Sequence, residues 1–472
     1  MKILLINPSL LQATTGQYKK TLEKERGIYP PIGLAYIAAI LEKNEHQVKI
    51  IDCDAEENYG EKIKETLEVF KPEIVGFYAM TWNFALANKM AGEIKKDYSG
   101  IITVLGGPNV TTMPEVSLSF DNFDFGLMGE GEETVIELFK KIENKINIDF
   151  EKILGLVYKK EGRIIVNPPR PLIQNLDSIP FPARHLLSME KYSDIFTKNQ
   201  RFSTIFATRG CHFNCTFCDR KNRMGRNWRF RSPQNIVQEI RQVIDEYGIR
   251  EFMFFDDNLI VDKTWAYQLM AEIKKLGIIW ECRERVDMVD EPMLRAMKEA
   301  GCYRIRFGFE SGSDEVLNTL KKGITRQQSL ACARLCKKIG IEIFGYFIIG
   351  APGETPQTIE QTIDLALKIN PSFALFSKMI LIPGSEIFEY ALASGQITKD
   401  YWEKFIRGEE MNGAPSLTKE KLSEKEIAGY VQEANKRFYF RFRFMAAKIL
   451  EIKSFDHLVR QIKMGLALVF KK

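Results

Sequence analysis

The sequence predicts an α/β protein in which a doubly wound parallel sheet precedes a partial (β/α)6 barrel and a helical C-terminal extension. In the first 145 residues, short apolar runs alternate with segments of helical periodicity, a rhythm typical of a parallel sheet with helices on both faces. Six further strand and helix units follow between residues 203 and 381, as many as a partial barrel needs. Because 472 residues exceed what one hydrophobic core holds, we expect domains at 1–145 and 201–394, a linker at 146–200 and a C-terminal region at 395–472.

The first domain is expected to contain strands at 2–7, 47–52, 74–78 and 101–106, and helices at 33–43, 61–70, 84–96 and 134–142. Such a sheet binds ligands at the carboxyl ends of its strands, where glycines let a bulky ligand approach the backbone. Turns of this kind follow the strands: Asn7-Pro8-Ser9, Met80-Thr81-Trp82-Asn83, Gly106-Gly107-Pro108-Asn109 and Gly129-Glu130-Gly131-Glu132. No G-x-G-x-x-G sequence opens a helix after the first strand, which disfavours a dinucleotide. A purely structural flavodoxin-like domain is the alternative.

The barrel strands are expected to begin near Ser203, Glu251, Ile278, Tyr303, Glu342 and Phe373. The helix after the first of them has the clearest boundaries, with Ser232 as N-cap, Pro233 in the first turn and Gly248 past its end. The linker at 146–200 is expected to form a hairpin around Gly162, and its later prolines should stiffen it. In a barrel of this type, chemistry takes place at the carboxyl ends of the strands.

Three of the eight cysteines, Cys211, Cys215 and Cys218, stand close together directly after the first barrel strand. Three thiolates in one loop can hold three irons of a cubane cluster and leave the fourth iron open to another ligand. The alternative is that they share one helix face as small buried hydrophobes, which is what we expect for Cys332 and Cys336. The preceding Thr-Arg-Gly favours a loop, so the sequence predicts a reactive iron–sulfur centre.

The cysteine spacing resembles the cluster motif of the radical S-adenosylmethionine (radical SAM) enzymes. In that family the amine and carboxylate of SAM bind the fourth iron, and an electron from the cluster cleaves SAM to a 5′-deoxyadenosyl radical. The segments that end the next four strands also resemble the family, and they imply these SAM contacts: Phe217 in the cysteine loop, Asp256 and Asp257 for the amine, Arg285 or Arg283 for the carboxylate, Glu310 and Ser311 for the ribose, and Gly350 near the adenine. For Glu310, a helix cap is the alternative.

The turns of the first domain, together with Tyr29-Pro30-Pro31-Ile32-Gly33-Leu34-Ala35, resemble the cobalamin-binding domain that precedes the barrel in one radical SAM subgroup. This resemblance implies cobalamin contacts from the strand-end turns: Asn7, Pro8, Thr81, Gly106, Gly107, Gly129, Glu130 and Glu132. None of the four histidines lies in an Asp-x-His-x-x-Gly loop, so we expect no protein histidine on the cobalt.

A 4Fe–4S cluster, SAM and cobalamin together suggest C-methylation of an unactivated carbon, with one SAM as methyl source and a second as radical source. The cofactors carry the bond making, and we therefore assign no catalytic acid or base. An external electron donor, a flavodoxin or ferredoxin, is expected. One rival is oxidative ring formation or rearrangement without methyl transfer. Another is a cobalamin-binding sensor or carrier with an inert barrel, which the intact cysteine triad argues against.

The net charge is +5, but residues 436–472 contain ten Lys or Arg against two acids, and the remainder is close to neutral. A nucleic-acid partner is therefore not expected. The apolar run at the start is shorter than a secretory signal, and we expect a cytoplasmic protein. The basic tail with its interleaved aromatics, Phe438, Tyr439, Phe440, Phe442 and Phe444, predicts either peripheral contact with a membrane and a lipid-like substrate, or a cap that packs on the barrel.

Overall fold

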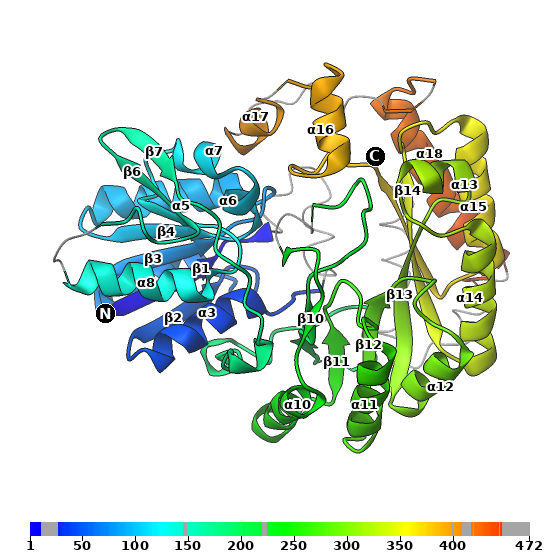
Figure 1. Cartoon of the computed structure of the whole chain (residues 1–472), viewed down its shortest axis with the longest axis horizontal. Coiled ribbons are helices and arrows are strands. Elements are labelled where there is room, and N and C mark those ends of the chain that lie inside the picture. Colours follow the sequence, from blue (N-terminus) through cyan, green and yellow to red (C-terminus); the bar gives the residue numbers. More distant parts are fainter. Residues whose placement is uncertain are drawn as a thin grey trace.

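The computed structural model describes residues 1–10, 27–144, 149–199, 201–219, 224–398, 400–407, 417–418, 420–442 and 444–445. Two sheets lie side by side, each with its own helices, and the C-terminal helices lie at the barrel and above the space between the sheets (Figure 1). The α/β architecture predicted from the sequence is therefore confirmed.

The first sheet has seven strands in the order β2-β1-β3-β4-β5-β6-β7. Their bounds are β1 Lys2–Asn7, β2 Gln47–Asp52, β3 Ile74–Tyr78, β4 Ile102–Gly106, β5 Phe125–Leu127, β6 Leu156–Lys160 and β7 Arg163–Val166. Strands β1 to β5 are parallel, whereas β6 and β7 form an antiparallel hairpin that pairs with β5. This hairpin was predicted as part of the linker. Because it completes the first sheet, the sheet is mixed and the first domain continues to Val166.

Helices cover both faces of this sheet, and the alternation of side chains along β1 shows why. Ile3 and Leu5 pack into a core with α3 and α8, whereas Leu4 and Ile6 pack into a second core with α4 and α5. The bounds are α3 Ile32–Lys43, α4 Tyr59–Phe70, α5 Phe84–Asp97, α6 Pro108–Thr112, α7 Pro114–Leu118 and α8 Gly131–Asn144. The doubly wound arrangement follows from a strand that is apolar on both faces.

The second sheet has six parallel strands in the order β15-β14-β13-β12-β11-β8, which confirms the partial barrel. Their bounds are β8 Ser203–Ile205, β11 Glu251–Phe254, β12 Ile279–Glu284, β13 Cys302–Glu310, β14 Glu342–Ile349 and β15 Phe373–Lys378. The outer helices are α10 Pro233–Tyr247, α11 Lys263–Lys274, α12 Glu291–Glu299, α13 Asp314–Thr319, α14 Arg326–Ile339 and α15 Pro356–Ile369. As predicted, Ser232 caps α10 by accepting from the Asn235 amide, and Gly248 ends it in a left-handed conformation.

The remaining connection, with two short 3-10 helices at Leu176–Ser178 and Arg184–Leu186, packs on the barrel. Buried Arg184 donates to Glu239 of α10 at 2.5 Å. The Phe196 ring contacts two barrel rings, Phe344 and Phe373, at centroid distances of 5.2 and 4.9 Å. These contacts hold the connection against the barrel.

The C-terminal region contributes α16 Glu386–Ala393, α17 Tyr401–Arg407 and α18 Glu424–Tyr439. Helix α18 lies along the edge strand β15, where the Tyr439 hydroxyl donates to the Ala374 carbonyl at 2.7 Å. Phe438 is fully buried and contacts Phe444, whereas Phe442 is 83% exposed. The tail thus caps the barrel with part of its aromatic set. The predicted helix that continues to residue 472 lies outside the described residues.

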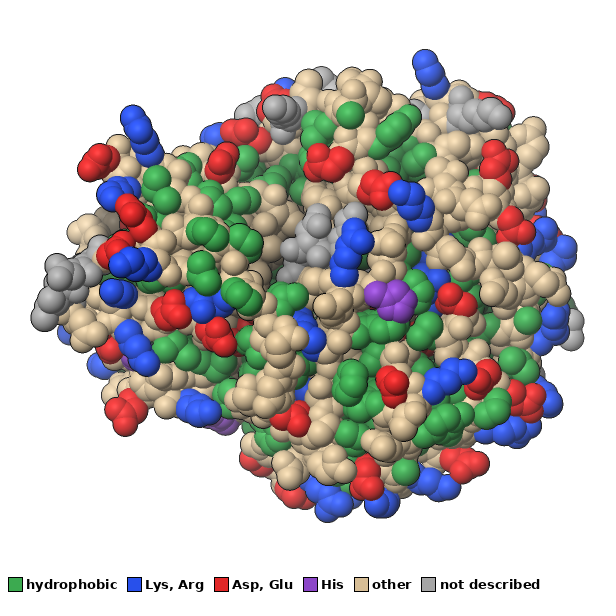
Figure 2. All heavy atoms as spheres, viewed as in Figure 1, with side chains coloured by type: hydrophobic (Ala, Val, Ile, Leu, Met, Phe, Trp, Pro, Cys, Tyr) green, Lys and Arg blue, Asp and Glu red, His purple; other side chains and the backbone are tan. Residues whose placement is uncertain are grey.

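Among the described residues, no helix is both long and apolar enough to cross a membrane. On the face shown in Figure 2, Lys and Arg side chains alternate with Asp and Glu, and the described residues form no continuous basic field there.

Candidate functional site

The three clustered cysteines lie in a loop that leaves β8 at its carboxyl end and returns at β10. Its base is closed by a two-stranded ladder in which β9 (Thr208–Arg209) pairs with β10 (Arg229–Phe230). Gly210 opens the loop with φ +93°, and a Cβ atom there would lie 2.3 Å from the Asn227 carbonyl oxygen. Only glycine fits this position, so the Thr-Arg-Gly approach shapes the loop that carries the cysteines.

Cys211, Cys215 and Cys218 are half-buried and free of disulfides, whereas the other five cysteines are fully buried in cores. The prediction of core packing for Cys332 and Cys336 is therefore confirmed. The described residues contain no group of His, Cys, Asp or Glu gathered tightly enough for a single metal ion. Three accessible thiols in one loop suit a larger iron–sulfur cluster, which spreads its ligands around a cubane.

Asp256 anchors the chain where β8 leads into the cysteine loop. Its Oδ1 accepts hydrogen bonds from the Ala207 amide at 2.9 Å, from the Thr208 hydroxyl at 2.7 Å and from the Thr208 amide. Burial raises the pKa of Asp256 to about 7, against the effect of these bonds. Oδ2 is buried and without a hydrogen-bond partner among the described residues. Contact of Asp256 or Asp257 with the SAM amine stays a prediction, but holding the cysteine loop is a role that the sequence did not reveal.

Arg285 and Arg283 were both predicted to meet the SAM carboxylate, and the structure gives them different surroundings. The guanidinium of Arg283 lies 3.9 Å from the centroid of the Phe255 ring. The Arg285 side chain is almost completely buried and forms an ion pair with Asp287. Arg285 therefore lies beside the cysteine loop, and two of its three guanidinium nitrogens already donate to other residues of the protein.

Glu310 ends β13 in a strained conformation with φ +60°, beside an irregularity in the pairing with β14. Its Oε1 accepts from Lys322 Nζ at 2.8 Å, and both side chains are about 8% exposed. Helix α13 is capped by Ser313, so the alternative that Glu310 is a helix cap is wrong. Strain of this kind is typical of functional sites, and contact with the ribose stays a prediction. No sequence pattern pointed to Lys322, because its burial depends on the fold.

Ser311 and Gly350 were predicted as further SAM contacts. Ser311 is fully buried, and its hydroxyl is 3.0 Å from the Thr362 hydroxyl of α15. This hydrogen bond joins the end of β13 to α15. Gly350 has φ +93° and lies against helix α18. A Cβ atom added at Gly350 would lie 3.2 Å from the Ile427 side chain of that helix. Gly350 thus permits close packing at the end of β14. Phe217 is half-buried, and its ring faces the Lys322 ammonium at 5.9 Å.

The carboxyl edge of the first sheet combines hydrogen-bonded polar side chains with tightly packed glycines. Asn7 donates to Asp52 at 2.8 Å, and the Pro8 carbonyl accepts from Asn83 at 2.9 Å. Gly107 has φ +106°, and a Cβ atom there would lie 2.7 Å from the Ala79 carbonyl oxygen. Thr81 is half-buried, Gly106 ends β4, and Gly129 has φ +68°. Cobalamin contacts from these residues stay predictions, and Asn83, which ties two of the turns together, was missed.

Glu130 and Glu132 join the first domain to the cysteine loop. Glu130 accepts from Arg209 at 2.9 Å and from Arg229 at 2.8 Å, and Glu132 accepts from Arg209 at 2.6 Å. Burial would raise the pKa of Glu130, but the hydrogen bond from Arg229 and the charges of both arginines outweigh it and lower the pKa. The sequence predicted both carboxylates as cobalamin contacts. Their ion pairs clamp the ladder at the base of the cysteine loop, and contact with cobalamin stays a prediction.

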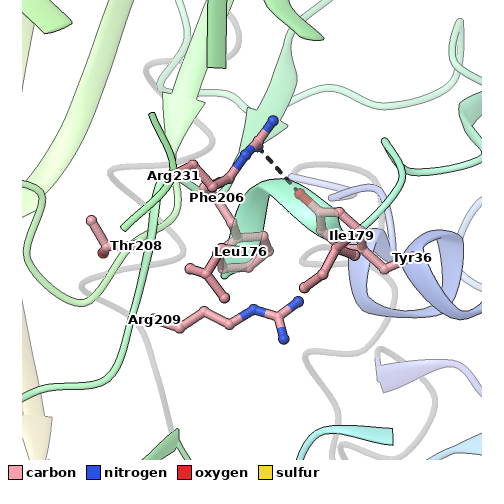
Figure 3. A pocket seen from close by; sticks show the side chains of 7 residues that line it. All are labelled: Tyr36, Leu176, Ile179, Phe206, Thr208, Arg209 and Arg231. Atoms are coloured by element: carbon pink, nitrogen blue, oxygen red, sulfur yellow. Dashed lines mark hydrogen bonds between the residues drawn. The ribbon is translucent and has the colours of Figure 1, made fainter. Parts of the chain in front are cut away.

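A small cavity lies beside this clamp, between the first domain, the connection and the barrel (Figure 3). Its lining residues are Tyr36, Leu176, Ile179, Phe206, Thr208, Arg209 and Arg231. Arg231 donates to the Tyr36 hydroxyl across it at 3.4 Å. A volume of about 10 Å³ admits one water molecule at most, so the cavity belongs to the domain interface and holds no cofactor.

The strand-end turns of both sheets contact one apolar cluster formed by α13, α16, α17 and the segments after β14 and β15. Met113, between α6 and α7, and Phe217, in the cysteine loop, both pack against it. Trp82, which follows β3, contacts Trp402 and Phe405 of α17 at centroid distances of 5.3 and 5.5 Å. The C-terminal helices therefore bridge the two edges at which the sequence predicts cofactors.

Comparison with known proteins agrees with both halves of the fold. Residues 18–139 match the family model of the B12 binding domain, and residues 205–366 match that of the radical SAM superfamily. An uncharacterized methyltransferase of Pyrococcus horikoshii is 35% identical, and the match covers 100% of this chain and 99% of that protein. The chain therefore belongs to the cobalamin-binding radical SAM enzymes. The cofactors of this class are a 4Fe–4S cluster, SAM and cobalamin.

Within that class, the relatives point to the methyltransferases. Cytidylyl-2-hydroxyethylphosphonate methyltransferase of Streptomyces wedmorensis is 30% identical, with 84% of this chain and 82% of the relative covered. The anaerobic magnesium-protoporphyrin IX monomethyl ester cyclase of Rubrivivax gelatinosus is 28% identical, with 82% and 70% covered. The radical SAM methyltransferase TsrM from Kitasatospora setae, solved with cobalamin and a 4Fe–4S cluster, has a TM-score of 0.68 at 19% identity, covering 84% of this chain and 75% of TsrM. This last likeness shows the fold.

Proposed function

We propose that this enzyme transfers a methyl group to an unactivated carbon of a small or lipid-like molecule. The bound cofactors supply the methyl group and the radical that removes a hydrogen atom from the substrate. The observation that carries the proposal is that Met113, beside the edge of the first sheet, and Phe217, in the cysteine loop, pack on the same apolar cluster. A substrate between those edges would be within reach of both cofactor sites.

The residues of this chain contribute position and exclusion of water. Asp256 holds the start of the cysteine loop, and Glu130 with Arg209 holds its base against the first domain. Trp82 and Trp402 close the space between the domains with apolar surface. Radical chemistry needs such fixed geometry and a dry site, and we therefore assign no general acid or base.

Partner and location remain part of the proposal. We expect electrons from a flavodoxin or ferredoxin, in the cytoplasm. The exposed rings of Phe440 and Phe442 are able to contact a membrane surface, whereas the Phe438 ring is buried against the barrel and does not contribute to such a contact.

The test compares extracts from cells with and without the gene, grown without oxygen. A metabolite or lipid that is heavier by one methylene, and present only with the gene, is the expected result. A strain carrying the gene with Cys211, Cys215 and Cys218 changed to alanine is the control, because it keeps the rest of the protein. A difference that persists in the control strain would contradict the proposal.

A second candidate is oxidative ring formation, favoured by the similarity to the Rubrivivax gelatinosus cyclase. The mass of the product separates the two reactions, since ring formation removes hydrogen and adds no carbon. Consumption of SAM is a second criterion. Methyl transfer uses two SAM per turnover, one of which ends as S-adenosylhomocysteine.

A further inference from the structure

Arg285 is held by several hydrogen bonds at the mouth of the barrel. Its Nε and Nη2 donate to the two carboxylate oxygens of Asp287 at 3.0 and 2.9 Å. Nη2 also donates to the carbonyl oxygen of Lys322 at 2.5 Å. A planar fork bound at both of these nitrogens has a fixed plane and direction, so where its third nitrogen points is set by the fold.

That third nitrogen, Nη1, points to the cysteine loop. It lies 3.8 Å from Cys215 Sγ, within hydrogen-bond distance for sulfur. The guanidinium carbon lies 3.6 Å from the centroid of the Phe213 ring, which stands in the same loop. An arginine stacked on an aromatic ring is attracted to it, more so when both are desolvated. Arg285 thus contacts two residues of the cysteine loop, the predicted cluster ligand Cys215 and the aromatic ring of Phe213.

We propose that Arg285 is a positioning residue that raises the reduction potential of the iron–sulfur cluster through Cys215. The reduced cluster carries one more negative charge than the oxidised cluster, so a positive hydrogen-bond donor at one of its sulfur ligands favours reduction. The Arg285 side chain is only 5% exposed, which leaves its charge weakly screened. The proposal depends on the cluster alone and holds whether the enzyme transfers methyl groups or forms rings.

The test is a redox titration of the reconstituted enzyme without SAM, followed by the paramagnetic signal of the reduced cluster. Arg285→Met is expected to lower the equilibrium constant for reduction about tenfold, which is 59 mV for a one-electron couple. Arg283→Met is the matched control, because Arg283 lies two residues earlier on the same strand and its guanidinium stacks on the Phe255 ring. It measures the effect of removing a nearby charge alone, and less than a threefold change is expected. Equal shifts in the two variants would overturn the proposal.

Two further variants keep the test decisive if Arg285→Met loses its cluster. Arg285→Lys keeps the charge but cannot bridge Asp287 and Cys215 together, and Asp287→Asn keeps Arg285 while loosening its fork. Both should lower the potential relative to the native enzyme and keep the native iron content. Unchanged potentials in both variants, together with weaker SAM binding by Arg285→Lys, would show instead that Arg285 meets the SAM carboxylate.

Discussion

The two carboxyl edges that face the C-terminal helices are built differently. The barrel edge carries buried charged side chains in defined pairs, such as Glu310 with Lys322 and Arg285 with Asp287. The edge of the first sheet carries the Glu130 ion pairs after β5, but at the end of β4 it offers backbone and glycine, as at Gly107, where a Cβ atom has no room. The barrel edge is suited to recognise polar groups by charge, whereas the first sheet is suited to accept a large flat ligand by shape. Each edge should therefore fail under a different kind of substitution.

The largest effect is expected when the barrel edge loses the three cysteines predicted to bind the cluster. Replacing Cys211, Cys215 and Cys218 together by alanine should abolish iron binding and SAM cleavage, because three thiolates hold the cluster. Iron content and 5′-deoxyadenosine release under dithionite measure the result. The control is Cys332→Ala with Cys336→Ala, both in the core of α14, which should keep the iron. Full iron content in the triple variant would refute the assignment.

The clamp between the two regions should come next. Glu130→Gln leaves Arg229 buried without its carboxylate, and breaking a buried ion pair costs about 3–5 kcal/mol. Urea unfolding measures this loss in free energy. Glu137→Gln, on helix α8 directly after Glu130 and paired with Arg170 through a half-exposed carboxylate, should cost less than about 1 kcal/mol. Equal losses would mean that the clamp does not hold the domains together.

The shape of the edge of the first sheet is tested by adding a methyl group at a glycine. Gly107→Ala forces a side chain into a backbone region that is almost exclusive to glycine, at about 1–3 kcal/mol, and against the Ala79 carbonyl. Cobalamin affinity, measured by absorbance titration, should fall at least tenfold. Gly100→Ala, at the opposite end of β4 in open space, should bind cobalamin as the native protein does. Unaltered affinity of Gly107→Ala would separate this turn from the cofactor.

The charge of the barrel edge is tested without a change of volume. Glu310→Gln should weaken SAM cleavage while the cluster remains, because each charge-assisted bond contributes about 1.5–3 kcal/mol. SAM affinity by equilibrium dialysis and the cleavage rate measure the loss. Glu315→Gln, exposed on α13, serves as the control. Native affinity and rate in Glu310→Gln would remove Glu310 from the SAM site.

The last effect, at most about 1.4 kcal/mol for each pH unit, is a difference in pH dependence between the two kinds of buried acid. Burial raises the pKa of Asp256 to about 7, so the folded protein binds this proton more tightly than the unfolded chain does. The free energy of unfolding should therefore fall as the pH rises from about 4 to 7, by up to about 1.4 kcal/mol per pH unit. The pKa of Glu130 is lowered, so its contribution is instead lost as the pH falls. The free energy of unfolding is measured by urea at several pH values. If it depends on pH equally in Asp256→Asn and in the native protein, Asp256 does not titrate in this range.

The sequence predicted most of the fold because the apolar periodicity is local. Strands β2, β3 and the start of β8 match residue for residue, and the glycine past α10 was correct. The hairpin β6–β7 was assigned to the linker because its pairing with β5 depends on chain folding rather than on pattern. The cysteine loop was identified from spacing alone. The ion pairs of Glu130 with Arg209 and Arg229 were not predicted, since nothing in the sequence shows that these arginines come to lie against it.

The most direct test supplies methyl-deuterated SAM to the reconstituted enzyme, with cobalamin, a reductant and an extract of cells that lack the gene. We expect a product that carries the deuterated methyl group, formed together with an equal amount of 5′-deoxyadenosine. The triple cysteine variant should form neither. Release of 5′-deoxyadenosine without deuterium in any product, or with a product lighter by two hydrogens, would contradict methyl transfer and leave ring formation as the reaction.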